Sequence, residues 1–137
     1  MTDQMNSDLS QSTKLPSRGR FLRMETAEKN GVIHRFIFET PPGETPDYFS
    51  DRDLPKKIRA KLKNDGFETD VFHEEGGPFS VLIDDDAAIS AVGMASRPIP
   101  AWCLAALQVR RQQRRWEMLR KRTDLEAPAV GNSLESD

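Results

Sequence analysis

The stretch that decides the fold is residues 54–83, LPKKIRAKLKNDGFETDVFHEEGGPFSVLI. Leu54, Ile58 and Leu62 recur every four residues with basic residues between them, a spacing that predicts a short helix with one apolar face. Gly66 suits the left-handed backbone position that follows the last turn of a helix. The segment therefore begins with an amphipathic helix that ends near residue 65.

The second half of this stretch predicts a β-hairpin. Residues 67–74 and 79–83 are rich in aromatic and β-branched side chains, and the turn sequence Glu75-Gly76-Gly77-Pro78 separates them. A helix followed by a hairpin is the unit around which we expect the rest of the chain to fold.

Length and composition predict one small domain. The chain has 137 residues, of which 36% are hydrophobic and 31% charged, and its formal net charge is −2. The apolar residues gather between Phe21 and Leu119, so a core is feasible only if the ends stay outside it. We expect a single α+β domain at residues 19–125, a disordered N-terminal tail at 1–18 and a disordered C-terminal tail at 126–137.

The single cysteine, Cys103, excludes an intrachain disulfide and is typical of a reducing compartment. It lies in the apolar segment WCLAAL, where we expect a buried and unreactive thiol. The first residues lack the basic start and apolar run of a secretory signal, and no segment reaches the roughly 18 apolar residues of a membrane span. These features predict a cytoplasmic protein that does not enter a membrane.

Two further strands complete the predicted sheet. We expect residues 21–26 and 32–39 to form these two strands. The Asn30-Gly31 pair between them is typical of a two-residue type I′ hairpin turn. Apolar groups fall on both faces of this hairpin, which leaves the strand register undecided.

Residues 87–95 predict a short helix that begins after three aspartates, and residues 101–124 predict the longest helix of the chain. The expected fold is a small α+β domain in ββαββα order, with a four-stranded antiparallel sheet covered by helices and a long basic C-terminal helix.

The strongest single feature is the sequence RRQQRRWEMLRKR at residues 110–122, which contains seven basic residues and one acidic residue. On a helix of about 3.6 residues per turn the arginine pairs 110/111 and 114/115 share one side, a spacing that can follow a phosphate backbone. The candidate binding residues are Arg110, Arg111, Arg114, Arg115, Trp116, Arg120, Lys121 and Arg122. The alternatives are contact with an acidic protein surface and a solvated helix end that complements the helix dipole.

An acidic stretch opposes this basic helix. Residues 65–86 hold eight acidic side chains and no lysine or arginine, and strand alternation places Glu68, Asp70 and Glu74 on one face with Phe72. This face meets the basic helix of the same chain, forms a solvated edge strand, or engages a basic partner, for instance by imitating a phosphate backbone. The candidate contact residues are Glu68, Asp70, Glu74 and Glu75.

The sequence carries no catalytic or cofactor motif. The aspartates Asp84, Asp85 and Asp86 have the chemistry of a magnesium or calcium site, but adjacent side chains point in different directions, so helix capping is the interpretation we adopt. His34 and His73 lack the spacing of a zinc site, and no nucleophile is placed beside either. We therefore predict no enzyme activity, no metal site and no cofactor.

These features predict a non-enzymatic accessory or regulatory protein that binds nucleic acid through residues 110–122. The alternative is a protein-interaction or inhibitor module that uses the acidic hairpin face on a basic partner. The stripe formed by Trp102, Val109, Trp116 and Leu119 also leaves room for a homodimer. The choice between DNA, RNA and a protein partner is open.

Overall fold

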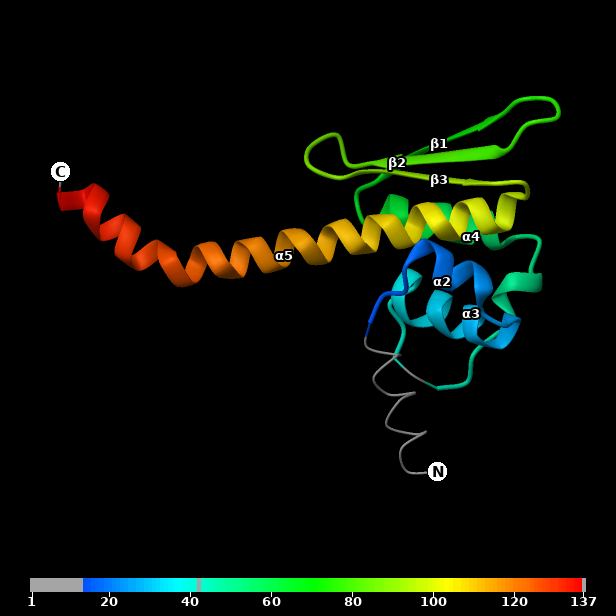
Figure 1. Ribbon diagram of the computed structural model, residues 1–137, viewed down its shortest axis with the longest axis horizontal. Helices are drawn as coiled ribbons and strands as arrows, with labels where there is room; N and C mark the ends of the chain where they lie inside the picture. The colour runs from blue at the N-terminus through cyan, green and yellow to red at the C-terminus, as the bar shows by residue number, and fades with distance from the viewer. Residues whose placement is uncertain (1–13, 42, 137) are drawn as a thin grey trace.

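In the computed structural model the chain forms an α+β domain with a three-stranded antiparallel sheet and a long C-terminal helix (Figure 1). The structure describes residues 14–41 and 43–136, with side chains described as far as Thr123. The elements in chain order are α2 (Arg18–Arg23), α3 (Thr26–Val32), the π-helix η1 (Ile33–Ile37), the 3₁₀-helix η2 (Tyr48–Ser50), α4 (Leu54–Asn64), β1 (Glu68–His73), β2 (Phe79–Asp84), β3 (Ser90–Ala95) and α5 (Pro98–Ser136).

The helix-hairpin unit predicted for residues 54–83 is confirmed. Leu54, Ile58 and Leu62 form the fully buried face of α4. The helix ends at Asn64, and Gly66 follows with a φ of 97° in the left-handed region, while the Phe67 amide donates a 2.9 Å hydrogen bond back to the Leu62 carbonyl. This Schellman-type ending turns the chain directly into β1.

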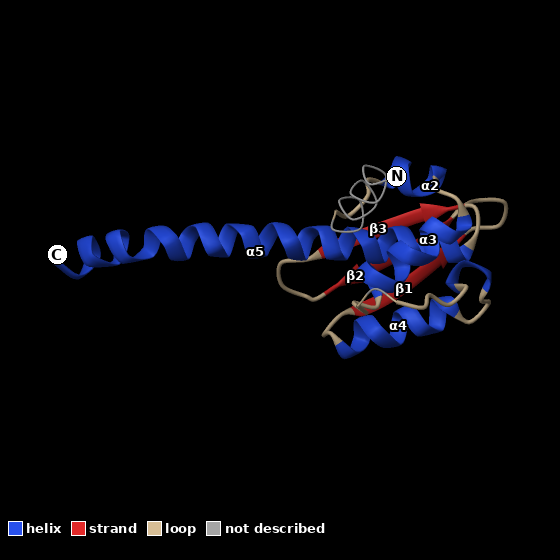
Figure 2. Ribbon diagram, turned by 90° about the horizontal axis from the view of Figure 1, so that it is seen from below, coloured by secondary structure: helices blue, strands red, loops and turns tan. Residues whose placement is uncertain are grey.

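The sheet has the order β1-β2-β3, and only one of its faces is covered (Figures 1 and 2). Val81 and Ile83 of β2 point to the covered face, together with Ala91 and Gly93 of β3. A side chain at Gly93 would overlap with the backbone of α5, so the helix lies directly on β3 at this position. The register of the strands follows from this packing, because a slip of one residue would turn the buried set outward.

The domain has three layers, with the first half of α5 in the middle layer (Figure 1). The sheet covers one side of this half, and α2 and α3 lie on the opposite side, while α4 lies beside it and contacts β1. Residues 101–107 of α5 are all buried, because neighbours surround the helix there. This enclosure explains the apolar composition of its first three turns.

The predicted N-terminal hairpin is wrong, and so is the ββαββα order. Residues 18–23 and 26–37 are helical, and Asn30-Gly31 lies inside α3 instead of forming a turn. Asn30 is buried, where its amide donates to Asp47 and its carbonyl oxygen accepts from the Phe49 amide. The apolar groups on both faces of the predicted strand belong to a helix, since Ile33, Phe36 and Ile37 have i, i+3, i+4 spacing and are buried together.

The helix predicted for residues 87–95 is also wrong, because β3 occupies most of this segment. Its side chains alternate: Ala91 and Gly93 are buried, while Val92 and Met94 are exposed. Small residues are needed on the buried side because α5 approaches the strand so closely. Packing therefore overrides the helical propensity of this alanine-rich stretch.

The long C-terminal helix is confirmed, and its second half leaves the domain (Figures 1 and 2). We call residues 114–136 of α5 the arm. The predicted tail at 1–18 falls largely on residues 1–13, which lie outside the described residues, and the predicted tail at 126–137 falls where side chains are not described. Within the part of the chain that the structure describes, no helix combines the length and apolar composition of a membrane span.

Candidate functional site

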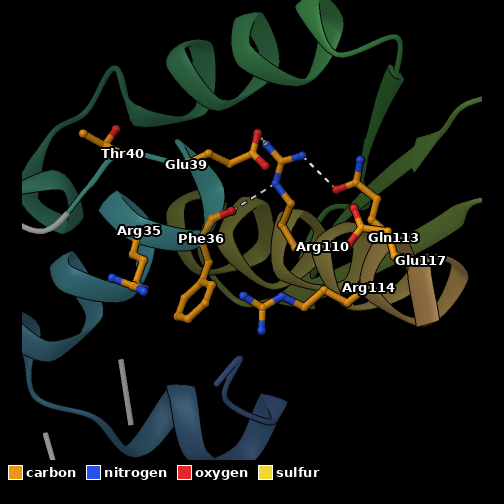
Figure 3. Close-up of a pocket in the computed structure, with 8 residues that line it drawn as sticks. All are labelled: Arg35, Phe36, Glu39, Thr40, Arg110, Gln113, Arg114 and Glu117. Carbon is orange, nitrogen blue, oxygen red and sulfur yellow. Dashed lines mark hydrogen bonds and ion pairs between the residues drawn. The ribbon is translucent and has the colours of Figure 1, made fainter. Parts of the chain in front are cut away.

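The basic run at residues 110–122 is divided between the domain and the arm. Arg110 belongs to the domain: its Nε donates to the Phe36 carbonyl at 3.0 Å and its Nη2 to the Ile37 carbonyl at 2.7 Å. The same Nη2 lies 3.0 Å from Asp65 Oδ2 and 3.3 Å from Glu39 Oε1 (Figure 3). Arg110 therefore provides hydrogen-bond donors to the last carbonyl groups of η1 and pairs with two carboxylates, which neutralise its charge within the chain.

Arg111 is also held by the domain. Its Nη2 donates to the Pro16 carbonyl at 2.7 Å, and its Nη1 donates to Gln108 one turn earlier in α5. These bonds attach the segment before α2 to the helix. The first two of the predicted binding residues therefore have structural partners.

A polar pocket of about 380 Å³ lies where the arm leaves the domain (Figure 3). The Phe36 ring at this pocket has guanidinium groups on two sides, with Arg114 Cζ at 4.9 Å and Arg35 Cζ at 6.0 Å from the ring centroid. Cation–π contact orients both groups at the surface. The residues that line the pocket are Arg35, Phe36, Glu39, Thr40, Arg110, Gln113, Arg114 and Glu117.

The remaining candidates lie on the exposed part of the arm: Arg115, Trp116, Arg120, Lys121 and Arg122. Arg115 and Arg122 are seven residues apart, so they share one side of the helix, and Arg114 and Lys121 share the adjacent side. Glu117 is the only acidic residue between positions 114 and 123. The arm thus has a cationic surface over two successive turns, and Trp116, which is 45% exposed, lies on the opposite side.

The four predicted acidic contact residues do not meet this helix. Glu68 and Asp70 share the outer face of the edge strand β1, as predicted, but Glu74 and Glu75 lie in the turn beyond it. The acidic residues that pair with the basic helix are Asp65 and Glu39, both through Arg110. The prediction that Glu74 shares a strand face with Glu68 and Asp70 is wrong because β1 ends at His73.

The uncovered face of the sheet is a surface that sequence reasoning missed. Its centre is apolar: Phe72 is 56% exposed, Val92 50% and Met94 45%, and Leu82 lies between β1 and β3 on the same face. We call these four residues the open sheet face. The alternation of apolar residues in 89–95 indicates a strand with one exposed face, although the alanines of this segment favour a helix.

The other titratable candidates have local roles. The Asp85 carboxylate accepts hydrogen bonds from the amides of Ile89, Ala87 and Ala88. These bonds, of which the one from Ile89 has the largest effect, hold the pKa of the carboxyl below its usual range. The aspartate thus holds the loop between β2 and β3 and does not cap a helix as we expected. Burial raises the pKa of the Cys103 thiol to about 12, so the thiol is protonated at neutral pH.

The histidines are engaged as well. His34 Nδ1 lies 2.8 Å from the Tyr48 hydroxyl, and the His73 ring stacks on Phe79 with centroids 3.8 Å apart. Among the described residues, no group of three acidic, cysteine or histidine side chains is arranged to hold a metal ion.

Comparison of the chain with protein-family models, with curated proteins and with solved structures found no match.

Proposed function

We propose that this chain is a non-enzymatic nucleic-acid-binding protein that uses the cations of the arm on phosphate groups. The observation that carries the proposal is the exposed set Arg115, Arg120, Lys121 and Arg122 on a helix that projects from the domain. Arg110 and Arg111 are left out of this set because the domain already binds them.

The mechanism is electrostatic docking with limited reading of sequence. Two turns of cations on one helical surface displace counterions from a phosphate backbone, which supplies affinity without contact to base edges. Arg35 and Arg114 extend this surface to the root of the arm, where Phe36 orients them. A helix that stands clear of its domain has the shape to enter a groove, and an exposed Trp116 can stack on an unpaired base.

The test is fluorescence anisotropy with labelled single-stranded and duplex DNA and RNA across a salt series. The arm variant carries Arg115→Gln, Lys121→Gln and Arg122→Gln. Removing three phosphate contacts lowers the slope of log K against log salt on duplex DNA by about 3.

The matched control removes three exposed charges from α4 with Lys56→Gln, Arg59→Gln and Lys63→Gln. This control changes net charge equally, so it separates contact through the arm from attraction by the whole molecule. Equal losses in the two variants, or no binding by the natural chain at low salt, would refute the proposal.

The second candidate function is protein interaction through the sheet. The specific observation is that the open sheet face is apolar at its centre and has Glu68, Asp70 and Asp84 on the same side of the strands. Such a surface suits a partner helix that is apolar in its middle and basic at its edges.

A further inference from the structure

We propose that the arm of a second copy of this chain covers the open sheet face, and that the contact is reciprocal and gives a closed dimer. The inference rests on the second candidate function, the use of the sheet for protein contact. Two surfaces of one chain carry it, because each has exposed apolar side chains and the charged residues of the two surfaces are opposite in sign.

The first surface is the open sheet face. Phe72, Leu82, Val92 and Met94 lie on adjacent strands, because the register pairs Leu82 with Val92, and Ser80 with Phe72 and Met94. No described helix lies on this side of the sheet (Figure 1). A sheet that is apolar on both faces gains stability from a layer on each side, and here one side has α5 and the other has none.

Acidic residues lie on the β1 edge and at one end of this apolar centre. Glu68 and Asp84 are register partners at one end of the face, and Asp70 lies beside Leu82. No basic residue belongs to the outward-pointing set of the three strands, which is Glu68, Asp70, Phe72, Ser80, Leu82, Asp84, Ser90, Val92 and Met94. The face therefore selects an occupant that is apolar in the middle and positively charged at its margins.

The arm has this composition. Trp116 and Leu119 are each 45% exposed and lie on one side of the helix, three residues apart. Arg115 and Arg122 flank them on one margin, and Arg120 flanks them on the other. An apolar stripe with basic residues beside it matches an apolar centre that has acidic residues at its β1 edge and at one end.

The occupant comes from another copy because of the course of α5. The helix runs along its own sheet on the covered face and then continues away from the domain (Figures 1 and 2). An unbroken helix cannot return to the opposite face of the same sheet. The arm of one chain reaches an open sheet face only on a second chain.

The orientation of the arm favours a reciprocal pair. Gln112 donates from Nε2 to the Ser90 carbonyl and accepts from the Ser90 amide, so this side of α5 faces the sheet layer. Trp116 and Leu119 continue the side of Gln112 by four and seven residues, so the apolar stripe of the arm also points toward the level of the sheet.

A second copy, turned by a half rotation about an axis in the sheet plane, places its own sheet over this stripe. The same rotation places its arm over the first sheet. The two sheets then share one layer, and each arm lies at the spacing that α5 already has from its own sheet. A six-residue strand spans about 20 Å and residues 114–136 of the helix about 35 Å, so the arm is long enough.

The dimer leaves the other side of the arm in solvent. Lys121 lies on the side away from Trp116, so it stays exposed when the apolar stripe is covered. The dimer covers Arg115, Arg122 and Trp116, so the dimer and nucleic acid compete for these three side chains.

Sedimentation velocity over a micromolar concentration series tests the dimer. The natural chain is expected to reach twice the 15.5 kDa mass of one chain. Two charge-reversed variants, Glu68→Lys with Asp70→Lys on the face and Arg115→Glu with Arg122→Glu on the arm, are each expected to weaken the dimer by about tenfold or more. A third variant, Trp116→Ala with Leu119→Ala, removes the apolar stripe at constant charge and is expected to be monomeric.

Mixing the two charge-reversed variants is the decisive step. Each arm in the mixture finds a face of opposite charge on the other variant, so the mixture is expected to dimerise at least about tenfold more tightly than either variant alone. The control Lys56→Glu with Arg59→Glu makes the same charge change as the arm variant on α4, and it should dimerise like the natural chain. Circular dichroism of each variant verifies that the domain is folded.

A natural chain that stays monomeric, a mixture that stays monomeric, or a dimer that survives loss of Trp116 and Leu119 overturns the inference. The failure of this proposal is distinguishable from failure of the nucleic-acid proposal. The variant Glu68→Lys with Asp70→Lys keeps every cation of the arm, so it should bind labelled duplex DNA as a monomer. A monomeric natural chain that binds duplex DNA would refute the dimer and leave nucleic-acid binding intact.

Discussion

Arg110 differs from Arg115 only by position along one helix, yet the two arginines have opposite roles. Arg110 is buried and donates to the carbonyls of Phe36 and Ile37 and to the carboxylate of Asp65. Helical periodicity gives the side of a helix on which a residue lies, but not the point at which the helix leaves the domain. The sequence therefore grouped both residues as ligand contacts.

The substitution Arg110→Met keeps an aliphatic stem of similar length and removes every donor. It leaves two buried carbonyls and a partly buried carboxylate without their partner, so we expect a loss of about 3 kcal/mol in the free energy of unfolding. Urea denaturation measures this loss. The control Arg115→Met removes an exposed charge and should change the free energy by less than about 0.5 kcal/mol. Equal effects would show that Arg110 is not a structural residue.

Two glycines respond in opposite directions to the same substitution. A Cβ at Gly93 would overlap with the Ala101 carbonyl and the Ala105 amide of α5, and neither backbone can move without displacing the helix. We expect Gly93→Ala to destabilise the domain by about 3 kcal/mol. Gly31 lies inside α3 with open space around it, so Gly31→Ala should stabilise the domain by about 0.5–1 kcal/mol. Thermal unfolding of the two variants gives the signs directly.

Among the elements, α4 and the first hairpin were predictable because local signals agreed with one another. Apolar spacing, a left-handed glycine and a Gly-Gly turn all indicated the same unit, and its buried residues are those that the spacing selected. Residues 87–95 were not predictable in this way. Their alanines favour a helix, and only the close approach of α5 to Gly93 makes a strand of small residues the better solution.

The β2–β3 connection depends on an ionised Asp85. Its carboxylate accepts from three consecutive amides at 2.9–3.1 Å, and these bonds lower the pKa of Asp85 from its ordinary value of 3.8. Because the folded-state pKa is lower than the unfolded one, the stabilisation is complete above the unfolded value and is lost as the pH falls through the folded value.

We therefore expect the difference in unfolding free energy between the natural chain and Asp85→Asn to be constant above about pH 5 and to shrink below pH 4. Urea titrations at several pH values measure this difference, and other acidic groups cancel because they are common to both proteins. A difference that stays constant down to pH 2 would show that the charge of Asp85 is not involved.

At the scale of the whole molecule, the domain and the arm are separable in stability. The core lies between α2 and the sheet, and the exposed side chains Met118 and Leu119 belong to a part of α5 that other described elements do not enclose. A chain that ends after Glu117 keeps the contact of Arg114 with Phe36 and the bonds of Arg110. We expect it to unfold, at low concentration, within about 0.5 kcal/mol of the natural chain.

The same truncation changes how stability depends on concentration. Association of folded chains stabilises them by mass action, so the melting temperature of the natural chain should rise with protein concentration if the arm of each copy covers the sheet of the other. The truncated chain lacks Leu119 and the cations Arg120, Lys121 and Arg122, so its melting temperature should stay constant over the same range. The two curves should meet at low concentration. Parallel curves would mean that any association of this protein does not involve the arm.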